Sequence, residues 1–412
     1  WLKSLLEWAA RLVEPVASPQ YEVAGHPHVS DPRWSPSLPS RPKAMKEKED
    51  VLTAVTPLAP SEADGRGSAL SATNGIHIVD ESLLSRVNLT RPPDKDNELI
   101  KVAAVHGPPG ILAVLRARRE YGWFVILCLR AVEVCLARSP SPDIKHQTDP
   151  VAFSMQMLEL EMIDEIFQLM KHFEHLRDVQ RSGLAILEIL IMDDPDWRDE
   201  VARKGGVALL CEIAKKRKDS PVIMCQVMTC MSYLAAEDYI EVMLCQHDAL
   251  EYVAHIMRHH AKNAELVTRT SLALLNLTVC EPHIEELLDK DAILPVLEVM
   301  DFHSSDVHLI IILCGVLANF SVKAEVRQLL VDHNVLPRIH KSMMLDPGNA
   351  VLQVAGLKAL VNYSTNAEHY MKMEEIEIPT LVGHVMVEHA HDPGVQKYGN
   401  YFLGQHTNCP IL

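Results

Sequence analysis

A period of 43 residues constrains the fold of this chain more than any other feature of its sequence. Steps of 43 from Val207 lead to Leu250, Ile293, Leu336 and Pro379, and Ile163 lies 44 residues before Val207. We call these six positions the anchors. Positions 0, 3 and 7 from an anchor lie on one face of an α-helix, and all three are apolar in nearly every unit. Each unit is therefore predicted to contain an amphipathic helix that buries the same face.

Two apolar columns accompany the anchors. Three residues after them stand Ile166, Leu210, Val253, Val296, Ile339 and Val382. Seven residues after them stand Met170, Ala214, Met257, Met300, Met343 and Met386. Methionine fills irregular gaps between packed helices, so we interpret the second column as core and not as an adaptable binding surface.

The rest of each unit adds two more helices. A polar interval such as "DFHSSD" follows the anchor helix, then a long apolar stretch such as "LIIILCGVLANFSV", then a shorter helical piece such as "EVRQLLVDHN". One short and two longer helices per 43 residues are typical of an α-solenoid, in which each unit buries its faces against its neighbours.

A single asparagine interrupts the apolar stretch at the same point of three units. Asn276 lies in "LALLNLTVCEP", Asn319 in "GVLANFSVKAE" and Asn362 in "KALVNYSTNAE", again 43 residues apart. Gln405 stands one period later and Tyr233 one period earlier. A buried amide without hydrogen-bond partners destabilises a fold. An asparagine that recurs with the period of the repeat therefore indicates a specific role for its side chain.

These helix endings, together with the anchor helix, make the sequence resemble the armadillo family over residues 97–412, most clearly over 158–405. The resemblance implies an all-α, right-handed armadillo-type α-solenoid whose third helices line a concave groove. It also implies that Asn276, Asn319, Asn362 and Gln405 bond the main chain of an extended peptide there. Nuclear-import adaptors of the family carry tryptophan four residues before each asparagine. Leu272, Gly315 and Lys358 stand there instead, which disfavours recognition of nuclear-localisation signals.

Composition narrows the classes of function. The net charge of −16 argues against a protein that wraps nucleic acid. The sequence contains no run of about 18 apolar residues, so it predicts no membrane-spanning helix. The nine cysteines show no paired spacing and indicate buried thiols in a reducing compartment. We find no catalytic constellation and predict no enzyme activity, cofactor or metal site. We interpret the histidine clusters His255/His259 and His384/His389/His391 as solvated. The basic runs "KKRK" and "RARR" could contact phosphates or acidic partners, but "KKRK" falls in an inter-helix loop, where we interpret its charge as solvated.

The first 96 residues differ in kind from the repeats. Trp1, Leu5, Trp8 and Leu12 form an apolar stripe on a predicted helix 1–14, and prolines recur from Pro15 to Pro42. Such an arm cannot bury enough surface to fold alone, so we expect its helix to dock on a partner chain, with a membrane interface as the alternative. The predicted organisation is an arm at 1–96, a divergent first repeat and linker at 97–150, and repeats at 151–412.

The function favoured by these patterns is a non-enzymatic protein–protein interaction scaffold, as a structural subunit of a large multiprotein assembly. Two alternatives stay open: a soluble adaptor that binds extended peptides in the groove, and a regulatory subunit of an enzyme or chaperone. Partners are expected to be protein chains. An intracellular, reducing compartment is expected, cytoplasmic or, since the sequence starts at Trp1 without methionine, mitochondrial or another organelle.

Overall fold

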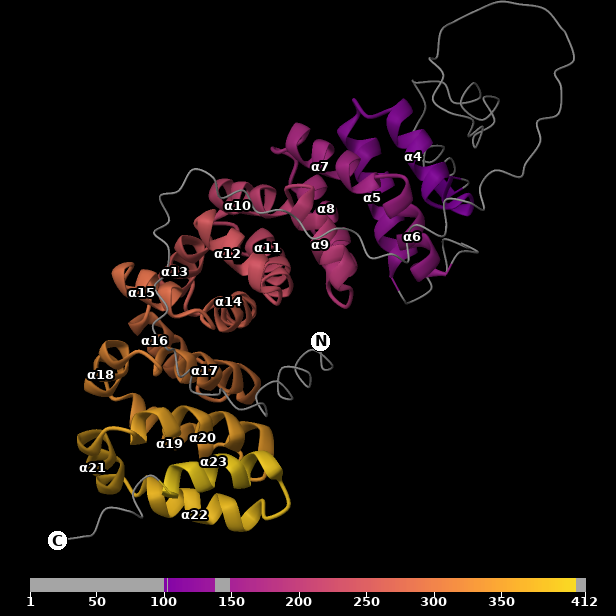
Figure 1. The fold of residues 1–412 in the computed structure, drawn as a ribbon. Coiled ribbons are helices and arrows are strands. Elements are labelled where there is room, and N and C mark those ends of the chain that lie inside the picture. Colours follow the sequence, from indigo (N-terminus) through magenta and orange to yellow (C-terminus); the bar gives the residue numbers. More distant parts are fainter. Residues whose placement is uncertain (1–99, 102, 138–148, 405–412) are drawn as a thin grey trace, which may run out of the picture. The chain divides into compact units, whose positions relative to one another are not determined.

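The computed structural model describes residues 100–101, 103–137 and 149–404. Within those ranges every regular element is an α-helix (Figure 1), as the repeat pattern predicts. The predicted arm, including Trp1, Leu5, Trp8 and Leu12, lies outside the described residues, as does Gln405.

From α6 onward each unit contains the three helices expected from the sequence, and the unit before it contributes α4 and α5 to the described residues. The first helices are α6 (Pro150–Glu159), α9 (Pro195–Arg203), α12 (Asp238–Gln246), α15 (Glu281–Asp289), α18 (Ala324–Asp332) and α21 (Ala367–Glu375). The second helices are α4 (Gly107–Ala117), α7 (Met162–His172), α10 (Gly206–Arg217), α13 (Ala249–His259), α16 (Leu294–Phe302), α19 (Val335–Met343) and α22 (Ile378–Glu388). The third helices are α5 (Gly122–Leu136), α8 (Arg177–Ile191), α11 (Pro221–Leu234), α14 (Ala264–Leu277), α17 (Val307–Phe320), α20 (Ala350–Ser364) and α23 (Pro393–Gly404).

The third helices stack in chain order, and each packs against the third helix of the unit before and the unit after it. Within a unit, the second helix packs against the third, as α13 does against α14 and α19 against α20. The core therefore runs through the array as one continuous layer, with every unit dependent on its neighbours for burial.

The predicted apolar columns form this core. The anchors from Ile163 to Leu336 and all six residues of the column three positions later are buried. The methionine column is buried from Met170 to Met343, and only Met386, in the last described unit, is partly exposed. A Cβ atom at Gly356 would lie 2.6 Å from the Cγ atom of Met343, so the methionine occupies the room that this glycine leaves. The interpretation of the methionines as core is confirmed.

Side-chain caps fix where the later third helices begin. Asn263, Asp306, Asn349 and Asp392 stand 43 residues apart, and each accepts a hydrogen bond from a backbone N–H in the first turn of the helix that follows. Such caps stabilise a helix start by about 1 kcal/mol each. The polar intervals of the sequence thus mark where the second helix of a unit ends and where the third helix begins.

The corner between the first and second helices repeats an unusual backbone conformation. One residue there has positive φ in each of six units: Glu161, Gly205, Asp248, Asp291, Asn334 and Glu377. L-residues other than asparagine and aspartate rarely adopt this left-handed region, because Cβ crowds the backbone. The two glutamates are therefore strained positions.

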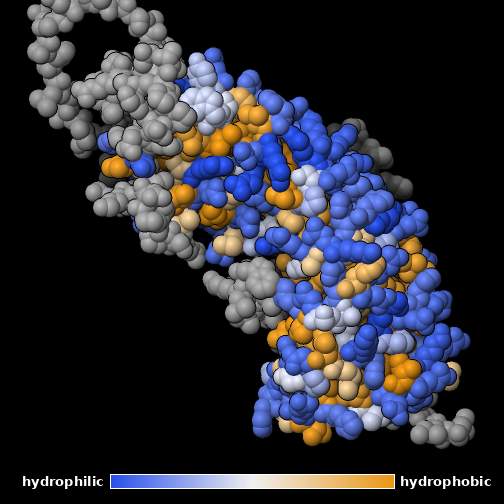
Figure 2. Space-filling view, turned by 180° about the vertical axis from the view of Figure 1, so that it is seen from behind, coloured by the Kyte–Doolittle hydropathy of each residue, from blue (hydrophilic) through white to orange (hydrophobic). Residues whose placement is uncertain are grey.

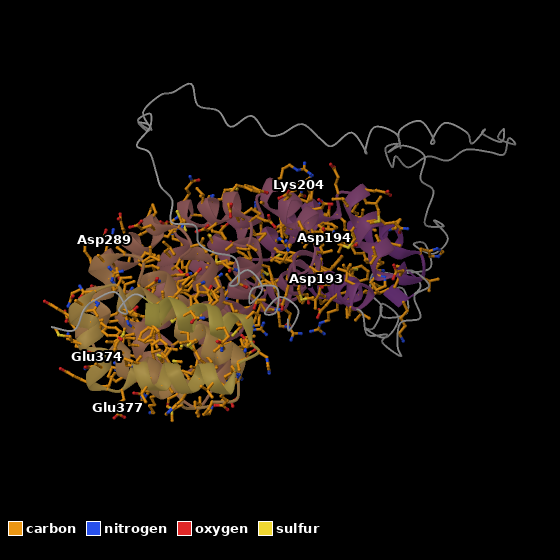
Figure 3. The ribbon with its side chains drawn as sticks, turned by 60° about the horizontal axis from the view of Figure 1, so that its bottom comes forward. Asp193, Asp194, Lys204, Asp289, Glu374 and Glu377 are labelled. Carbon is orange, nitrogen blue, oxygen red and sulfur yellow. The ribbon has the colours of Figure 1, made fainter. Side chains whose placement is uncertain are left out.

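Replacing Glu377 by glycine is expected to raise the free energy of unfolding by about 0.5–1 kcal/mol, because glycine adopts φ of 60° without steric cost. Figure 3 shows the Glu377 side chain at the edge of the ribbon, and it is exposed, so little contact is lost. Chemical denaturation measures the change. The matched control is Gly205→Ala, expected to lower stability by about 1 kcal/mol, since φ is 83° and a Cβ there meets no atom within 4 Å. Equal stability of all three proteins would contradict this account of the corner.

The first described unit departs from the others at Arg118. Its side chain is buried, although it stands where later units carry methionine or alanine. The guanidinium lies 5.1 Å from the centroid of the Phe124 ring, a cation–π contact that makes the buried charge tolerable.

Figure 2 shows a face on which polar residues prevail and apolar residues are scattered between them. No helix in the described ranges is both long and apolar enough to cross a bilayer. The described cysteines are unpaired, and five of them are buried: Cys128, Cys135, Cys211, Cys230 and Cys314.

Candidate functional site

Three asparagines, one per unit, lie close to the C-terminal ends of consecutive third helices. Asn276 belongs to α14, Asn319 to α17 and Asn362 to α20, and each side chain is partly buried. We call these three residues the asparagine row. The structure places them at equivalent positions because the helices that carry them stack with the same register.

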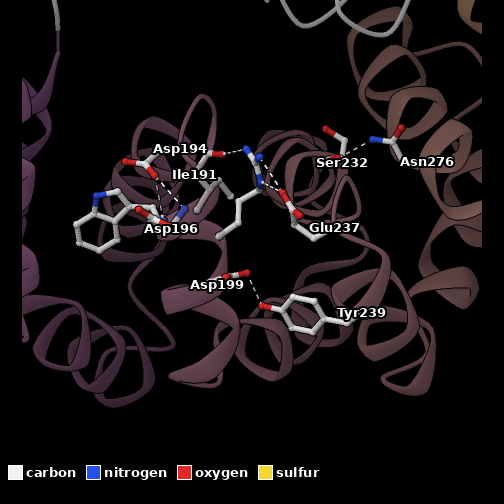
Figure 4. Close-up of polar contacts among 10 residues, drawn as sticks. Ile191, Asp194, Asp196, Asp199, Ser232, Glu237, Tyr239 and Asn276 are labelled. Carbon is white, nitrogen blue, oxygen red and sulfur yellow. Dashed lines mark hydrogen bonds and ion pairs between the residues drawn. The ribbon is translucent and has the colours of Figure 1, made fainter. Parts of the chain in front are cut away.

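Each asparagine bonds to the end of the preceding third helix. The Nδ2 atom of Asn276 donates to the carbonyl oxygen of Ser232 at 2.8 Å (Figure 4). In the next unit, Asn319 donates to the carbonyl of Leu275 at 3.0 Å, and Asn362 repeats this bond to Ala318, also at 3.0 Å. The spacing is 44 residues in every case.

Two of these amides make a second bond in the same direction. Asn319 Nδ2 lies 3.2 Å from Thr278 Oγ1, and Asn362 Nδ2 lies 3.0 Å from Ser321 Oγ. The last carbonyls of any helix lack partners within it. The asparagines therefore satisfy helix ends across the unit boundary. The sequence alone did not indicate this contribution to stability.

The other side of each amide is left available. Once Nδ2 faces the preceding helix, Oδ1 points the opposite way, as Figure 4 shows for Asn276. Among the described residues, no hydrogen bond reaches Oδ1 of any of the three. An amide oxygen held in this way can accept a hydrogen bond from a backbone N–H of another chain.

The row stops on its N-terminal side. Tyr233 stands one period before Asn276 and is partly exposed, and Ile189 takes the equivalent place in α8. Burial raises the pKa of Tyr233 to about 12, with the nearby Glu188 carboxylate acting in the same direction. This phenol is neutral at physiological pH and can donate a hydrogen bond.

Charged groups lie before the N-terminal end of the row and also beside its last asparagine. Burial raises the pKa of Glu188 on α8, an effect that Arg269 on α14 opposes and Glu133 on α5 reinforces. At the other end, burial and the Lys397 charge lower the pKa of Lys358 on α20 to about 8. Two carboxylates on α5 and α8 thus lie before the row, with the Arg269 guanidinium of α14 near them, whereas an amine stands one helical turn before Asn362.

The histidine clusters behave mostly as the sequence suggests. His389 Nε2 lies 2.7 Å from the carbonyl oxygen of Pro347, and His303 repeats this bond to Ala261 at 2.8 Å. His384 and His391 are exposed. The first cluster is different, because the rings of His255 and His259 lie with their centroids 4.7 Å apart and Asp219 Oδ1 lies 3.4 Å from His255 Nε2.

The basic run "KKRK" at the end of α10 contacts the preceding unit. Lys216 pairs with Glu174 and Glu212, and Arg217 donates to the carbonyl of Glu174 at 2.8 Å. These contacts are mostly exposed, and each is worth little. A cavity of about 20 Å³ next to them, between Met170 and Lys216, has room for about one water molecule and none for a cofactor.

Comparison with protein-family models gives no match, and comparison with curated proteins gives no significant one. Solved structures do match. A designed armadillo repeat protein superposes with a TM-score of 0.51 at 18% identity, over 59% of this chain and 99% of its own. A second, solved in complex with the peptide (KR)4, gives a TM-score of 0.50 at 18% identity over 59% and 98%. An engineered protein reaches a TM-score of 0.57 at 13% identity over 79% and 88%.

The fold is therefore that of an armadillo-like repeat solenoid. Repeat solenoids of this kind form extended concave surfaces, and one of these structural neighbours was solved with a peptide bound.

Proposed function

We propose that this chain is a non-enzymatic interaction scaffold that holds an extended segment of a partner protein along the asparagine row. The observation that supports the proposal is the hydrogen bonding of the three side-chain amides. Each has its Nδ2 atom occupied by the preceding helix, and each offers an Oδ1 atom with no bond from the described residues. A row of fixed acceptors is complementary to the N–H groups of an extended chain.

The spacing of the row suits such a segment. Packed helices lie about 8–10 Å apart, and an extended chain advances about 3.3 Å per residue. Consecutive asparagines would therefore meet every second or third residue of the partner. Because the contacts are to main chain, affinity would come from the row, and side-chain preference from its neighbours.

The charges beside the row supply that preference. An acidic residue of the partner near Lys358 would stabilise the charged form of this amine, and a basic residue near Glu133 and Glu188 would offset their mutual repulsion. We therefore propose a segment with its basic part toward α8 and its acidic part toward α20. Tryptophan shelves for lysine stems are missing at Leu272, Gly315 and Lys358, so a nuclear-localisation signal remains a disfavoured partner.

The wider setting that we propose is a multiprotein assembly, with the N-terminal arm as a second attachment through Trp1, Leu5, Trp8 and Leu12. The adaptor and the regulatory subunit are the alternatives, and both would use the same row. Unpaired cysteines support an intracellular, reducing compartment.

A peptide selection on the full chain tests the proposal. Linear peptides enriched from a random displayed library would be measured by fluorescence anisotropy against wild type and the variant Asn276→Ala/Asn319→Ala/Asn362→Ala. Three lost hydrogen bonds of about 1 kcal/mol each predict about 100-fold weaker binding.

The matched control is Thr278→Ala/Ser321→Ala. It removes the hydroxyl partners of Asn319 and Asn362 on the structural side and leaves every Oδ1 atom in place. We expect this control to bind within about threefold of wild type while sharing part of the loss of stability. If the triple variant binds the selected peptides as tightly as the control does, the asparagines are structural only.

A further inference from the structure

Three side chains with metal-binding chemistry converge where two units meet. Asp219 lies in the loop between α10 and α11, His255 lies in the last turns of α13, and His260 follows that helix. One ligand atom from each lies within 4.8 Å of those of the other two. The contact between Asp219 Oδ1 and His255 Nε2 is 3.4 Å.

The buried nitrogen of His255 lacks a proper partner. Its Nε2 atom is closed off from solvent and makes no hydrogen bond within the described part of the chain, since the approach of Asp219 does not satisfy hydrogen-bond geometry. A buried polar atom left in this state costs about 1–3 kcal/mol. Nearly all such atoms in proteins have a partner, so an ion or a water molecule is expected beside this nitrogen.

Two imidazole nitrogens and one carboxylate oxygen match the ligands that zinc takes. Calcium and magnesium prefer oxygen ligands alone, whereas Zn²⁺ binds histidine and aspartate at about 2.0–2.2 Å in tetrahedral geometry. Ligand atoms of such a site stand about 3.3 Å apart at those bond lengths, so small side-chain rotations would close the observed cluster. We infer that Asp219, His255 and His260 bind a divalent transition-metal ion of the Zn²⁺ type, with water as the fourth ligand.

The charged residues around the site determine how tightly it would bind a cation. The positive charge of Lys218 lies near His255 and opposes a cation, as does His259 when protonated. The single carboxylate is mostly exposed, so its attraction is screened by solvent. These features predict reversible binding and not a permanently occupied structural zinc.

A metal ion at this position would connect two neighbouring units of the array. Asp219 belongs to one unit and the two histidines to the next, so the ion would join the loops of neighbouring units. Asn276 lies twelve residues along α14 from its first residue, Ala264, about 18 Å away at 1.5 Å per residue. The site is thus separate from the asparagine row and would stiffen the array without blocking it.

Zinc titration of the chelator-treated full chain tests this inference. Calorimetry would compare wild type with Asp219→Asn and His260→Gln, which alter side chains near the surface and should leave the fold intact. We expect one site whose affinity falls at least about 30-fold in either variant, in line with the 10–100-fold effects of even outer groups at metal sites. The control His391→Gln changes an exposed histidine in another unit and should bind as wild type does.

Two further readouts separate this site from chance binding by other histidines or thiols. Co²⁺ should give a tetrahedral spectrum without sulfur-to-cobalt charge transfer. Zn²⁺ should slow hydrogen exchange in the α10–α11 loop of wild type but not of His260→Gln. Unchanged zinc affinity in Asp219→Asn and His260→Gln, or a thiolate spectrum with Co²⁺, would overturn the inference.

Discussion

Replacing Arg198 by methionine is expected to lower the free energy of unfolding by about 2–3 kcal/mol. This is slightly less than the cost of about 3–5 kcal/mol for breaking a fully buried ion pair, because the Glu237 side chain is 31% exposed. The Arg198 side chain is only 11% exposed, and its Nε and Nη2 atoms each lie 2.9 Å from Glu237 Oε1. Its Nη1 atom donates to the carbonyl of Ile191 at 3.0 Å (Figure 4).

The reason for so large an effect is the place of these bonds. Ile191 is the last residue of α8, and Glu237 precedes the first residue of α12, so one guanidinium joins the ends of two successive units. Methionine keeps the apolar stem but leaves the Ile191 carbonyl and the Glu237 carboxylate without their partner. In a linear array this weakens one interface more than the rest, so urea denaturation should broaden or split into two transitions.

The matched control is Tyr239→Phe, at the same junction. Tyr239 donates to Asp199 at 2.7 Å, but this hydrogen bond is exposed and should be worth less than about 1 kcal/mol. Should Arg198→Met prove no more harmful than Tyr239→Phe, the guanidinium does not couple the two units.

Replacing Lys358 by methionine should raise the free energy of unfolding at pH 7, by up to about 3 kcal/mol. Burial lowers the pKa of this amine from 10.5 to about 8, and each pKa unit corresponds to about 1.36 kcal/mol. At pH 7 the lysine is charged in both states, so the folded state carries the full cost of holding a charge away from water. Methionine of similar length removes that cost.

The effect should depend on pH in one direction. Between pH 8 and 10.5 the folded state loses its proton and the unfolded state still holds it, so the stability of wild type rises with pH. The advantage of Lys358→Met should therefore shrink by about 2 kcal/mol between pH 7 and pH 9.5. Lys341→Met, on an exposed side chain of α19, should show neither the gain nor this change. An advantage that is constant with pH would rule out a buried charge as its cause.

The repeat pattern was enough to predict the helices and the core. The anchors and the methionine column mark buried positions because burial recurs with the period of the array, and a periodic signal survives variation in any one unit. The asparagine row could be located in the same way. The hydrogen bonds of these asparagines to Ser232, Leu275 and Ala318 could not be predicted from the sequence, because they depend on how one unit stacks on the next.

Other features left no signal in the sequence. Glutamate has no preference for positive φ, so nothing about Glu161 or Glu377 marks them as corner residues. Asp219 stands 36 residues before His255, and only the packing of adjacent units brings the two together. The arm prediction for residues 1–96 stays a prediction, as its residues lie outside those described.

A double-mutant cycle between the asparagine row and a peptide backbone tests the central claim most directly. One selected peptide would be synthesised with single ester bonds in place of amides, which removes one N–H donor at a time. Binding of each ester peptide would be measured against wild type and Asn319→Ala. We predict that at one position the ester weakens binding to wild type about tenfold and leaves binding to Asn319→Ala unchanged, a coupling energy of about 1.4 kcal/mol. If every ester weakens both proteins equally, the Oδ1 atom of Asn319 does not receive the partner's main chain, and the proposed binding mode is wrong.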